Sequence, residues 1–180
     1  MDLLSNHYGM NLHDLSIGDD APETVLAVIE IPAGSHNKYE YDHELGAMKL
    51  DRVLHSPFFY PVDYGFLPRT LAEDGDPLDV IVVTDAPVFP GCLAEIRPIG
   101  MMAMLDGGER DNKILCVQAS NPHYGHVREL EDIEPHILEE IAHFFSQYKF
   151  LEKKETVIEG WSDRQSAYAA IRAGLAAFQG

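Results

Sequence analysis

The sequence predicts a mainly β fold with two flanking helices in the C-terminal half of the chain. Short β-rich runs separated by Gly, Pro and Asp turns fill the first two thirds. From about residue 135 the apolar period becomes helical. The chain has 180 residues, 46% of them hydrophobic, which is enough for one sizeable core. No repeat or linker interrupts it, so residues 1–180 are expected to form a single domain.

Six runs have the composition of strands, because they combine β-branched and aromatic residues and are bounded by turn residues. Their regular spacing predicts a small antiparallel barrel or a sandwich. The six ranges are 24–31, 38–42, 48–54, 80–84, 93–99 and 113–119.

Two helices are predicted in the last third, packed against the strands. The first would start at Pro135, a residue suited to a first helical turn. Its apolar residues recur at spacings of four and three and form one stripe: Ile137, Ile141, Phe144, Tyr148 and Leu151. The second helix is predicted from Ser162 and Gln165, which have capping-box spacing. Its apolar face would carry Tyr168, Ile171, Leu175 and Phe178.

Composition limits the partners and the compartment. Thirteen Lys and Arg against thirty Asp and Glu give a formal net charge of −17, the wrong sign for binding a phosphate backbone. Nucleic acid is therefore not an expected partner. No apolar stretch approaches the ~20 residues of a membrane span, and no signal peptide pattern opens the chain, so we expect a cytoplasmic protein without membrane contact. Cys92 and Cys116 lie in apolar runs and are expected to be free buried thiols.

The stretch DGDPLDV at residues 74–80 places three aspartates within six positions. Two carboxylates about 4 Å apart repel by roughly 4 kcal/mol at an effective dielectric of ~20. A solvated acidic turn is one interpretation, because turns favour Asp and Gly. A calcium loop of the EF-hand type fits poorly, since Leu78 would stand at its fifth position and Asp79 at its invariant glycine. The third interpretation is a site for a bound cation.

Further charged residues interrupt other strand-like runs. Alternation would place Lys38, Glu40 and Asp42 on one face of their strand. Glu30 interrupts a nearly continuous apolar run, where it needs a strand end or a charged partner. The turn DGGERDNK supplies further groups, although alone it could be an ordinary hairpin loop: Asp106, Asp111 and Lys113. Oxygen donors without His or Cys favour Mg²⁺, Mn²⁺ or Ca²⁺ over zinc.

Motifs for other chemistries are missing from the sequence. It contains no HExxH, no GxxxxGK phosphate loop and no GxSxG nucleophile elbow. His123 and His126 lie in a Gly/Pro loop and are interpreted as surface residues. Covalent Ser or Cys catalysis therefore has no support.

From about residue 22 to the end, the sequence resembles family I soluble inorganic pyrophosphatases. DGDPLDV is similar to the aspartate signature of that family, and further segments match in order: IEIPAGSHNKYEYD, GAMKLDR, FYPVDYGFLP, PGCLAEIRPIG, DGGERDNK and HFFSQYK. The resemblance implies a closed five-stranded OB-like barrel with two helices. It also implies hydrolysis of pyrophosphate to two orthophosphates with Mg²⁺, with Mn²⁺ as an alternative metal, and a homohexamer in bacterial members.

The resemblance also assigns roles by position. Asp76 corresponds to the proposed general base, and Tyr60 lines the site. Metal-facing roles fall on Asp74, Asp79, Asp106 and Asp111, with Glu30 and Glu40 in the outer part of the metal site. Phosphate contacts fall on Lys38, Arg52, Tyr64, Lys113, Tyr148 and Lys149. Asp63 stands where many members have Asn, and Arg110 where the residue is often acidic, so the local charge near Tyr64 is left open.

Several alternatives stay open at the level of sequence. The chain could be a non-catalytic OB-like module that holds Ca²⁺ for rigidity, although such a site has no use for Lys38, Arg52 and Lys149. Tyr148 could be placed by burial alone. His136 and His143 lie two helical turns apart, and on the resemblance their helix is near a subunit interface, where protonation would loosen an oligomer. Residues 1–21 receive no role.

Overall fold

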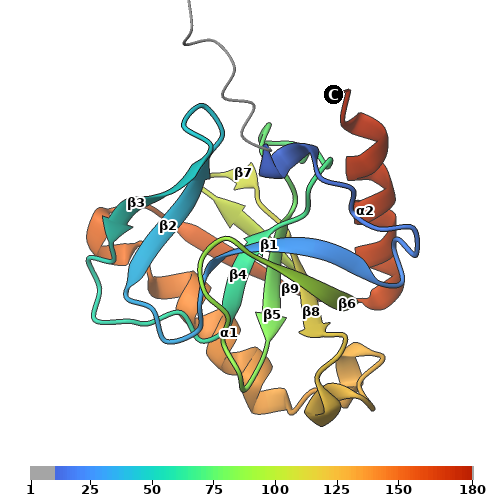
Figure 1. The fold of residues 1–180 in the computed structure, drawn as a ribbon. Helices are drawn as coiled ribbons and strands as arrows, with labels where there is room; N and C mark the ends of the chain where they lie inside the picture. The colour runs from blue at the N-terminus through green and yellow to red at the C-terminus, as the bar shows by residue number, and fades with distance from the viewer. Residues whose placement is uncertain (1–10, 180) are drawn as a thin grey trace, which may run out of the picture.

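The computed structural model of the protein describes residues 11–179. Within this range the chain forms nine strands and two α-helices, drawn in Figure 1. The strands are β1 (Val25–Ile31), β2 (Asn37–Asp42), β3 (Ala47–Val53), β4 (Asp63–Phe66), β5 (Asp79–Val83), β6 (Cys92–Asp106), β7 (Glu109–Arg110), β8 (Lys113–Gln118) and β9 (Thr156–Asp163). The helices are α1 (Pro135–Gln147) and α2 (Arg164–Ala177).

Five strands close into a ring in the order β1, β4, β5, β8, β6, because β6 also pairs with β1. The prediction of a closed five-stranded barrel with two helices is therefore confirmed. Pairing is antiparallel throughout the ring except between β5 and β8, which run parallel with Asp79 opposite Lys113. The expectation of a purely antiparallel barrel was wrong at this pair. β2 and β3 form a separate hairpin beside the ring (Figure 1).

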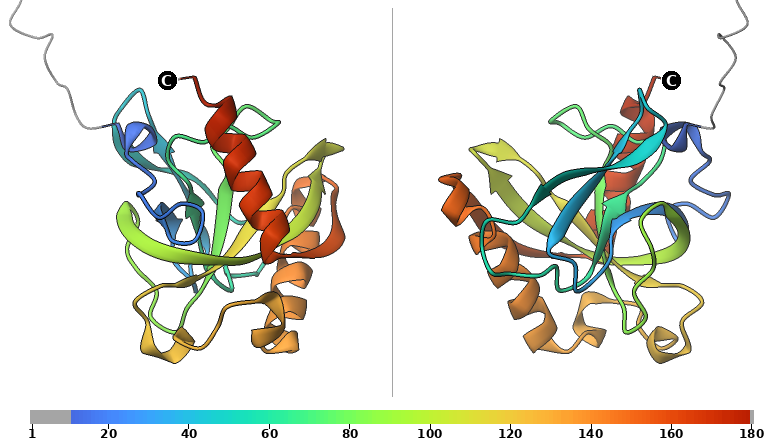
Figure 2. Two further views of the ribbon diagram at one scale, coloured as in Figure 1. Left: turned by 90° about the vertical axis from the view of Figure 1, so that its right-hand side faces the viewer. Right: turned by 60° about the vertical axis from the view of Figure 1, so that its left-hand side comes forward.

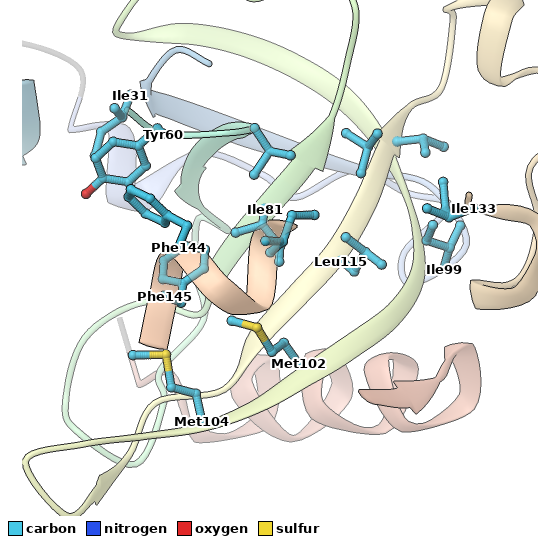
Figure 3. Close-up of a cluster of buried hydrophobic side chains, with 14 of the residues drawn as sticks. Ile31, Tyr60, Ile81, Ile99, Met102, Met104, Leu115, Ile133, Phe144 and Phe145 are labelled. Atoms are coloured by element: carbon cyan, nitrogen blue, oxygen red, sulfur yellow. The ribbon is translucent and has the colours of Figure 1, made fainter. Parts of the chain in front are cut away.

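The two helices lie on different sides of the barrel (Figures 1 and 2). α1 contributes Ile141, Phe144 and Phe145 to one hydrophobic core, which also contains Met102 and Met104 of β6 (Figure 3). α2 contributes Ala167 and Ile171 to a second core on its own side. Each helix thus buries one face against the strands, as an amphipathic helix requires.

The central strands β5 and β8 are apolar on both faces because each face meets a different core. Ile81 and Leu115 point into the core beneath α1, whereas Val80 and Ile114 belong to the core beneath α2. All four side chains are fully buried. This explains the continuous apolar runs VIVV and ILCV, since a strand covered on both sides does not alternate with polar residues.

Gly65 allows β4 to lie against β1. A Cβ atom at this position would come within 1.9 Å of the carbonyl oxygen of Val28, a backbone atom that cannot move aside. Any larger residue would push the two strands apart at their point of pairing.

Three strands were not predicted: β4, β7 and β9. The predicted run at 93–99 is part of β6, which continues to Asp106. The first helix was predicted to reach Leu151 but ends at Gln147, and Leu151 is 56% exposed. Of the two thiols, Cys116 is buried as expected, whereas Cys92 is partly exposed, and both are free.

The N-cap of α2 also differs from the prediction. Asp163, and not Ser162, accepts a hydrogen bond from the backbone N–H of Ser166 at 2.9 Å. Tyr168 and Ile171 are buried on the predicted face of the helix. Among the described residues, no helix is long and apolar enough to cross a membrane.

Candidate active site

A cavity of about 350 Å³ opens where the ends of several strands meet, and most of the predicted site residues line it. β5 and β8 start at this end of the barrel, and β6, which runs antiparallel to β8, finishes there. Chain direction thus brings together segments that are far apart in sequence. The predicted residues on the cavity wall are Glu30, Lys38, Glu40, Tyr64, Asp74, Asp76, Asp79, Asp106, Asp111, Tyr148 and Lys149.

The acidic turn is held in place by hydrogen bonds of Leu78, which lies between Asp76 and Asp79. Buried Leu78 donates its N–H to the hydroxyl of Thr70 at 2.9 Å, and its carbonyl accepts from Leu67 at 2.9 Å. Gly75 takes a φ of +92°, a left-handed conformation that favours glycine. The backbone N–H of Asp76 donates to the carboxylate of Asp74 at 3.1 Å, which keeps the two acidic residues side by side.

Lys113 lies beneath the carboxylates, with its side chain only 1% exposed. Its Nζ is 2.7 Å from Oδ2 of Asp79 and 2.8 Å from Oδ1 of Asp111. Burial alone would lower the pKa of Lys113, but the two carboxylates outweigh burial and raise it above the usual range. The ammonium group therefore stays charged and holds the start of β5 beside the start of β8.

Three tyrosines belong to the core beneath α1: Tyr60 and Tyr148 are buried, and Tyr64, whose ring centroid lies 5.4 Å from Nζ of Lys113, is partly buried. Burial raises the pKa values of Tyr60, Tyr64 and Tyr148 well above the ordinary value, so their hydroxyl groups stay neutral. Tyr64 donates its O–H to Asp79. Tyr60 lies against Tyr64 with the ring centroids 5.9 Å apart and supports it from behind.

Tyr148 has both features that the sequence left as alternatives. Its ring stacks on Phe144 with centroids 5.1 Å apart, and only 4% of the residue is exposed. It also lines the cavity, next to Lys149. Burial and a place on the cavity wall therefore go together at this residue.

The remaining cations form ion pairs around the rim. Lys38 contacts Glu40 and lies 3.5 Å from Asp51, and Lys149 contacts Asp106. Each of these pairs places a positive group on the cavity wall.

Arg52 is not among the residues on the cavity wall. Its Nε lies 3.1 Å from the carboxylate of Glu152, and Asp51 is its second partner. One of its terminal nitrogens, Nη2, is buried without a hydrogen-bond partner in the described part of the chain. That nitrogen retains a free donor, which is the type of group that an anion can satisfy.

Burial and neighbouring charges raise the pKa values of two carboxyl groups on the cavity wall. Burial raises the pKa of Glu30 to about 8, although the backbone N–H of Tyr41 donates to its Oε1 at 2.7 Å and opposes the shift. Burial also raises the pKa of Asp76, and neighbouring Asp74 and Asp79 raise it further. Acidic groups in this state gain stability when a cation arrives, because a nearby positive charge favours their ionised form.

The Asp and Glu side chains on the cavity wall offer carboxylate oxygens, which are the ligands that hard divalent cations prefer. Their present arrangement is held by lysines: within residues 11–179, no three Asp, Glu, His or Cys side chains surround one common point. Lys113 and Lys149 occupy the positions beside Asp79, Asp111 and Asp106. These carboxylates are therefore the candidate ligands of a bound metal.

Sequence reasoning missed several residues of the wall, among them His13, Tyr41 and His43. His13 belongs to residues 1–21, to which no role was assigned. No local pattern marks these residues, because they reach the cavity only through long-range packing.

A closed barrel with carboxylates, lysines and tyrosines around one cavity defines a class of protein suited to a small, highly charged ligand. Comparison with known proteins narrows this class. The family model described as inorganic pyrophosphatase matches residues 27–179. The chain therefore belongs to the inorganic pyrophosphatase family, as the resemblance predicted.

Individual relatives agree over almost the whole chain. The inorganic pyrophosphatase of Nostoc is 52% identical over 88% of this chain and 94% of its own length. The crystal structure of the Thermus thermophilus inorganic pyrophosphatase shares 47% identity and a TM-score of 0.92, covering 94% of this chain and 99% of that one. The Helicobacter pylori pyrophosphatase has a TM-score of 0.88 at 36% identity, covering 92% and 99%.

Proposed function

We propose that this protein hydrolyses inorganic pyrophosphate to two orthophosphates. One observation carries the proposal: a single cavity combines a cluster of carboxylates with lysines and tyrosine hydroxyls, in a chain of the inorganic pyrophosphatase family. The carboxylates suit divalent cations, and the lysines and hydroxyls suit phosphate oxygens. Both sets are needed to bind a small polyanion together with its metal ions.

Metal binding is proposed for the carboxylates at the strand ends. The ligands would be Asp74, Asp79, Asp106 and Asp111, with Glu30 and Glu40 in the outer part of the site. Bound Mg²⁺, or Mn²⁺ in its place, neutralises substrate charge and lowers the pKa of a coordinated water. Burial, joined by repulsion from neighbouring carboxylates, raises the pKa values of Glu30, Asp76 and Asp111, and this supports the assignment because a cation favours their ionised form.

Asp76 is proposed as the general base that accepts the proton of the attacking water. It lies on the cavity wall between Asp74 and Asp79, and burial, followed by these two neighbours, raises its pKa. A base with such a shifted pKa holds a proton more readily during the reaction. Its carboxylate makes no ion pair in the described part of the chain, unlike that of Asp79, so it is available for proton transfer.

The phosphoryl groups would be bound by donors from several elements. Lys113 and Tyr64 supply donors from β8 and β4, and Arg52 offers its free terminal nitrogen from β3. Lys38, Tyr148 and Lys149 complete the proposed set; like Tyr64 they lie on the cavity wall, whereas Lys113 and Arg52 are not among its lining residues. Charge-assisted hydrogen bonds of this kind stabilise charge that develops on the leaving phosphate. Tyr60 would act indirectly, through its contact with Tyr64.

The substrate is proposed to arrive as its magnesium complex, because a chain with a net charge of −17 repels bare pyrophosphate. We further propose a homo-oligomer, a hexamer on the family resemblance, in the cytoplasm. Neither a membrane nor nucleic acid enters the proposal.

Phosphate release from pyrophosphate, measured by a colorimetric assay with Mg²⁺, tests the proposed function. We expect turnover with Mg²⁺ and negligible turnover in excess chelator, restored by adding Mg²⁺ back. A calcium-holding binding module, the competing function, would release no phosphate under any condition. Substantial turnover in excess chelator would refute the metal-dependent mechanism.

A further inference from the structure

Two histidines outside the proposed set form part of the cavity wall. His13 lies in the segment before β1, and His43 follows β2 in the turn toward β3. Their rings stack with centroids 5.7 Å apart at an interplanar angle of 29°. His13 precedes the region matched by the family model, which begins at residue 27. The family model therefore does not cover this residue.

The ring of His13 is held by aromatic contacts on its remaining sides. It meets Phe66 edge to face at 4.8 Å and 89°, and it meets Tyr41 at 5.3 Å and 67°. Rings in such a packed position have few alternative rotamers. The imidazole is therefore presented to the cavity in one orientation.

The backbone around His13 is equally well anchored. Its carbonyl accepts a hydrogen bond from the backbone N–H of Arg69 at 2.9 Å, and the Arg69 Nε donates to the carbonyl of Asp14 at 2.9 Å. Next to it, the N–H of Leu12 donates to the hydroxyl of Tyr41 at 3.1 Å. These contacts attach the N-terminal segment to β2 and to the loop after β4, close to the acidic turn.

The nitrogen atoms of the His13 ring have no hydrogen-bond partner within residues 11–179. Burial, followed by the proximity of His43, lowers the pKa of His13, while Asp14 acts in the opposite direction. A neutral imidazole offers one N–H donor and one acceptor nitrogen. His13 thus brings an unused donor to a wall on which seven carboxylates face two lysines, Lys38 and Lys149.

We propose that His13 is a substrate-positioning residue, which donates a hydrogen bond to a terminal phosphate oxygen of the metal–pyrophosphate complex at the cavity rim. This inference rests on the proposed function. His43, stacked on the opposite face, holds the ring in place. A neutral donor suits this side of the cavity, because it attracts the phosphate oxygens without repelling the metal ions that accompany them.

A positioning contact at the rim would act mainly on binding. Removal of one hydrogen bond to a charged oxygen weakens binding about tenfold. A contact made equally in the ground state and the transition state changes KM and leaves kcat almost unaltered. A purely structural role for His13 would instead change stability, or lower kcat by displacing the acidic turn.

Three variants separate these roles. H13F keeps an aromatic ring between Tyr41 and Phe66 but removes the nitrogens, H13Q keeps an N–H donor, and H126Q is the matched control. His126 is exposed in the loop after β8. β8 starts at the cavity, so this loop lies at the end of the strand that is far from the cavity. Each variant is assayed for kcat and KM with Mg²⁺ and pyrophosphate. Binding of methylenediphosphonate, a diphosphate that is not hydrolysed, is measured by calorimetry with Mg²⁺.

We expect KM and the dissociation constant of methylenediphosphonate to rise about tenfold in H13F, with kcat within twofold of wild type. H13Q should recover most of the affinity, and H126Q should behave as wild type. Unchanged affinity in H13F, or a loss of kcat without a loss of affinity, would overturn the role of His13. Absence of wild-type turnover would refute the proposed function instead, and the binding data would still decide the role of His13.

Discussion

Asp76 stands between two other carboxylates of its own turn; burial raises its pKa, and Asp74 and Asp79 raise it further. Asp76→Asn keeps the size of the side chain but cannot accept a proton. We expect kcat to fall by about 10²–10⁴-fold, the usual contribution of a positioned general base. Steady-state kinetics with Mg²⁺ measure the loss. Glu73→Gln, an exposed neighbour in the same loop, is the control and should retain full activity. Near wild-type rates in Asp76→Asn would remove Asp76 from this role.

Glu30 makes the stability of the metal-free protein dependent on pH. Its pKa is about 8 when folded, against an ordinary value of 4.5 when unfolded. Below pH 4.5 the Glu30 carboxyl group is protonated in both the folded and the unfolded state. As pH rises toward 8, the unfolded state loses its proton first, so stability falls, and it levels off above pH 8. Between pH 5 and pH 8 this amounts to roughly 3–4 kcal/mol.

Glu30→Gln should remove this dependence, because an amide does not ionise and can still accept the hydrogen bond from Tyr41. Urea unfolding in the presence of chelator measures the effect. We expect the variant to be more stable than wild type at pH 8 and similar to it at pH 5. Equal stability of the two proteins at both pH values would contradict the burial of an ionisable Glu30.

At the residue scale, the acidic groups named from the sequence lie together on the cavity wall, whereas the two histidines of that wall were not predicted. Asp74, Asp76 and Asp79 lie within six successive positions of one turn, so their proximity follows from local geometry. His13 and His43 are thirty residues apart and meet only because the N-terminal segment crosses β2. No periodicity encodes such a contact.

At the scale of elements, the cap of α2 offers a direct comparison between two neighbouring side chains. Asp163 accepts hydrogen bonds from the N–H and the hydroxyl of Ser166 at 2.9 Å and 2.8 Å. Asp163→Ala should therefore reduce the free energy of unfolding by about 1 kcal/mol. Ser162→Ala, the cap expected from sequence, should have almost no effect. Thermal or urea unfolding of both variants measures the difference, and equal losses would contradict the assignment of the cap.

The strands that sequence reasoning missed depend on pairing more than on their own composition. β9 contains Gly160 and Glu159 and has no strong strand pattern, yet it pairs with β6 from Thr156 to Asp163. β4 is only four residues long and includes Gly65. β6 continues through Gly100 because it has β1, β8 and β9 as partners along its length. Tertiary context therefore overrides propensity at these elements.

The end of α1 differs from the prediction for a similar reason. The apolar spacing continues to Leu151, but the helix stops at Gln147, and a short 3₁₀ turn spans Phe150–Glu152. Ending there leaves Tyr148 and Lys149 on the cavity wall. Periodicity alone could not reveal that Leu151, at 56% exposure, lies outside the core.

At the scale of the whole molecule, two surface properties influence the association of subunits: the excess of negative charge and the exposed hydrophobic residues. Several large apolar side chains are exposed, including Phe89 and Phe150, each 70% exposed. Apolar side chains that form a contiguous patch mark a contact with another chain, whereas single ones are normal on a surface. Subunit contacts in the proposed oligomer would cover part of this surface. Each added subunit would also bring its own net negative charge to the assembly.

The two histidines of α1 have different surroundings. His136 lies 3.3 Å from Glu139 and 3.5 Å from Glu140, so it has partners within its own subunit. His143 is exposed and contacts Phe58 edge to face at 5.8 Å, without an acidic partner in the described residues. If α1 lies near a subunit interface, His143 can meet the partner subunit there, and histidine is the side chain whose charge ordinarily changes between pH 5 and pH 8.

Light scattering at pH 8 and pH 5 tests this consequence of the α1 geometry. We expect an oligomeric mass at pH 8 and a smaller mass at pH 5, since histidine gains its charge between these values. His143→Gln should stay oligomeric at both pH values because it cannot become charged, whereas His136→Gln should dissociate like wild type. A mass that is the same at pH 5 and pH 8 in the wild-type protein would count against control by His143, and dissociation of His143→Gln at pH 5 would assign the effect to other groups.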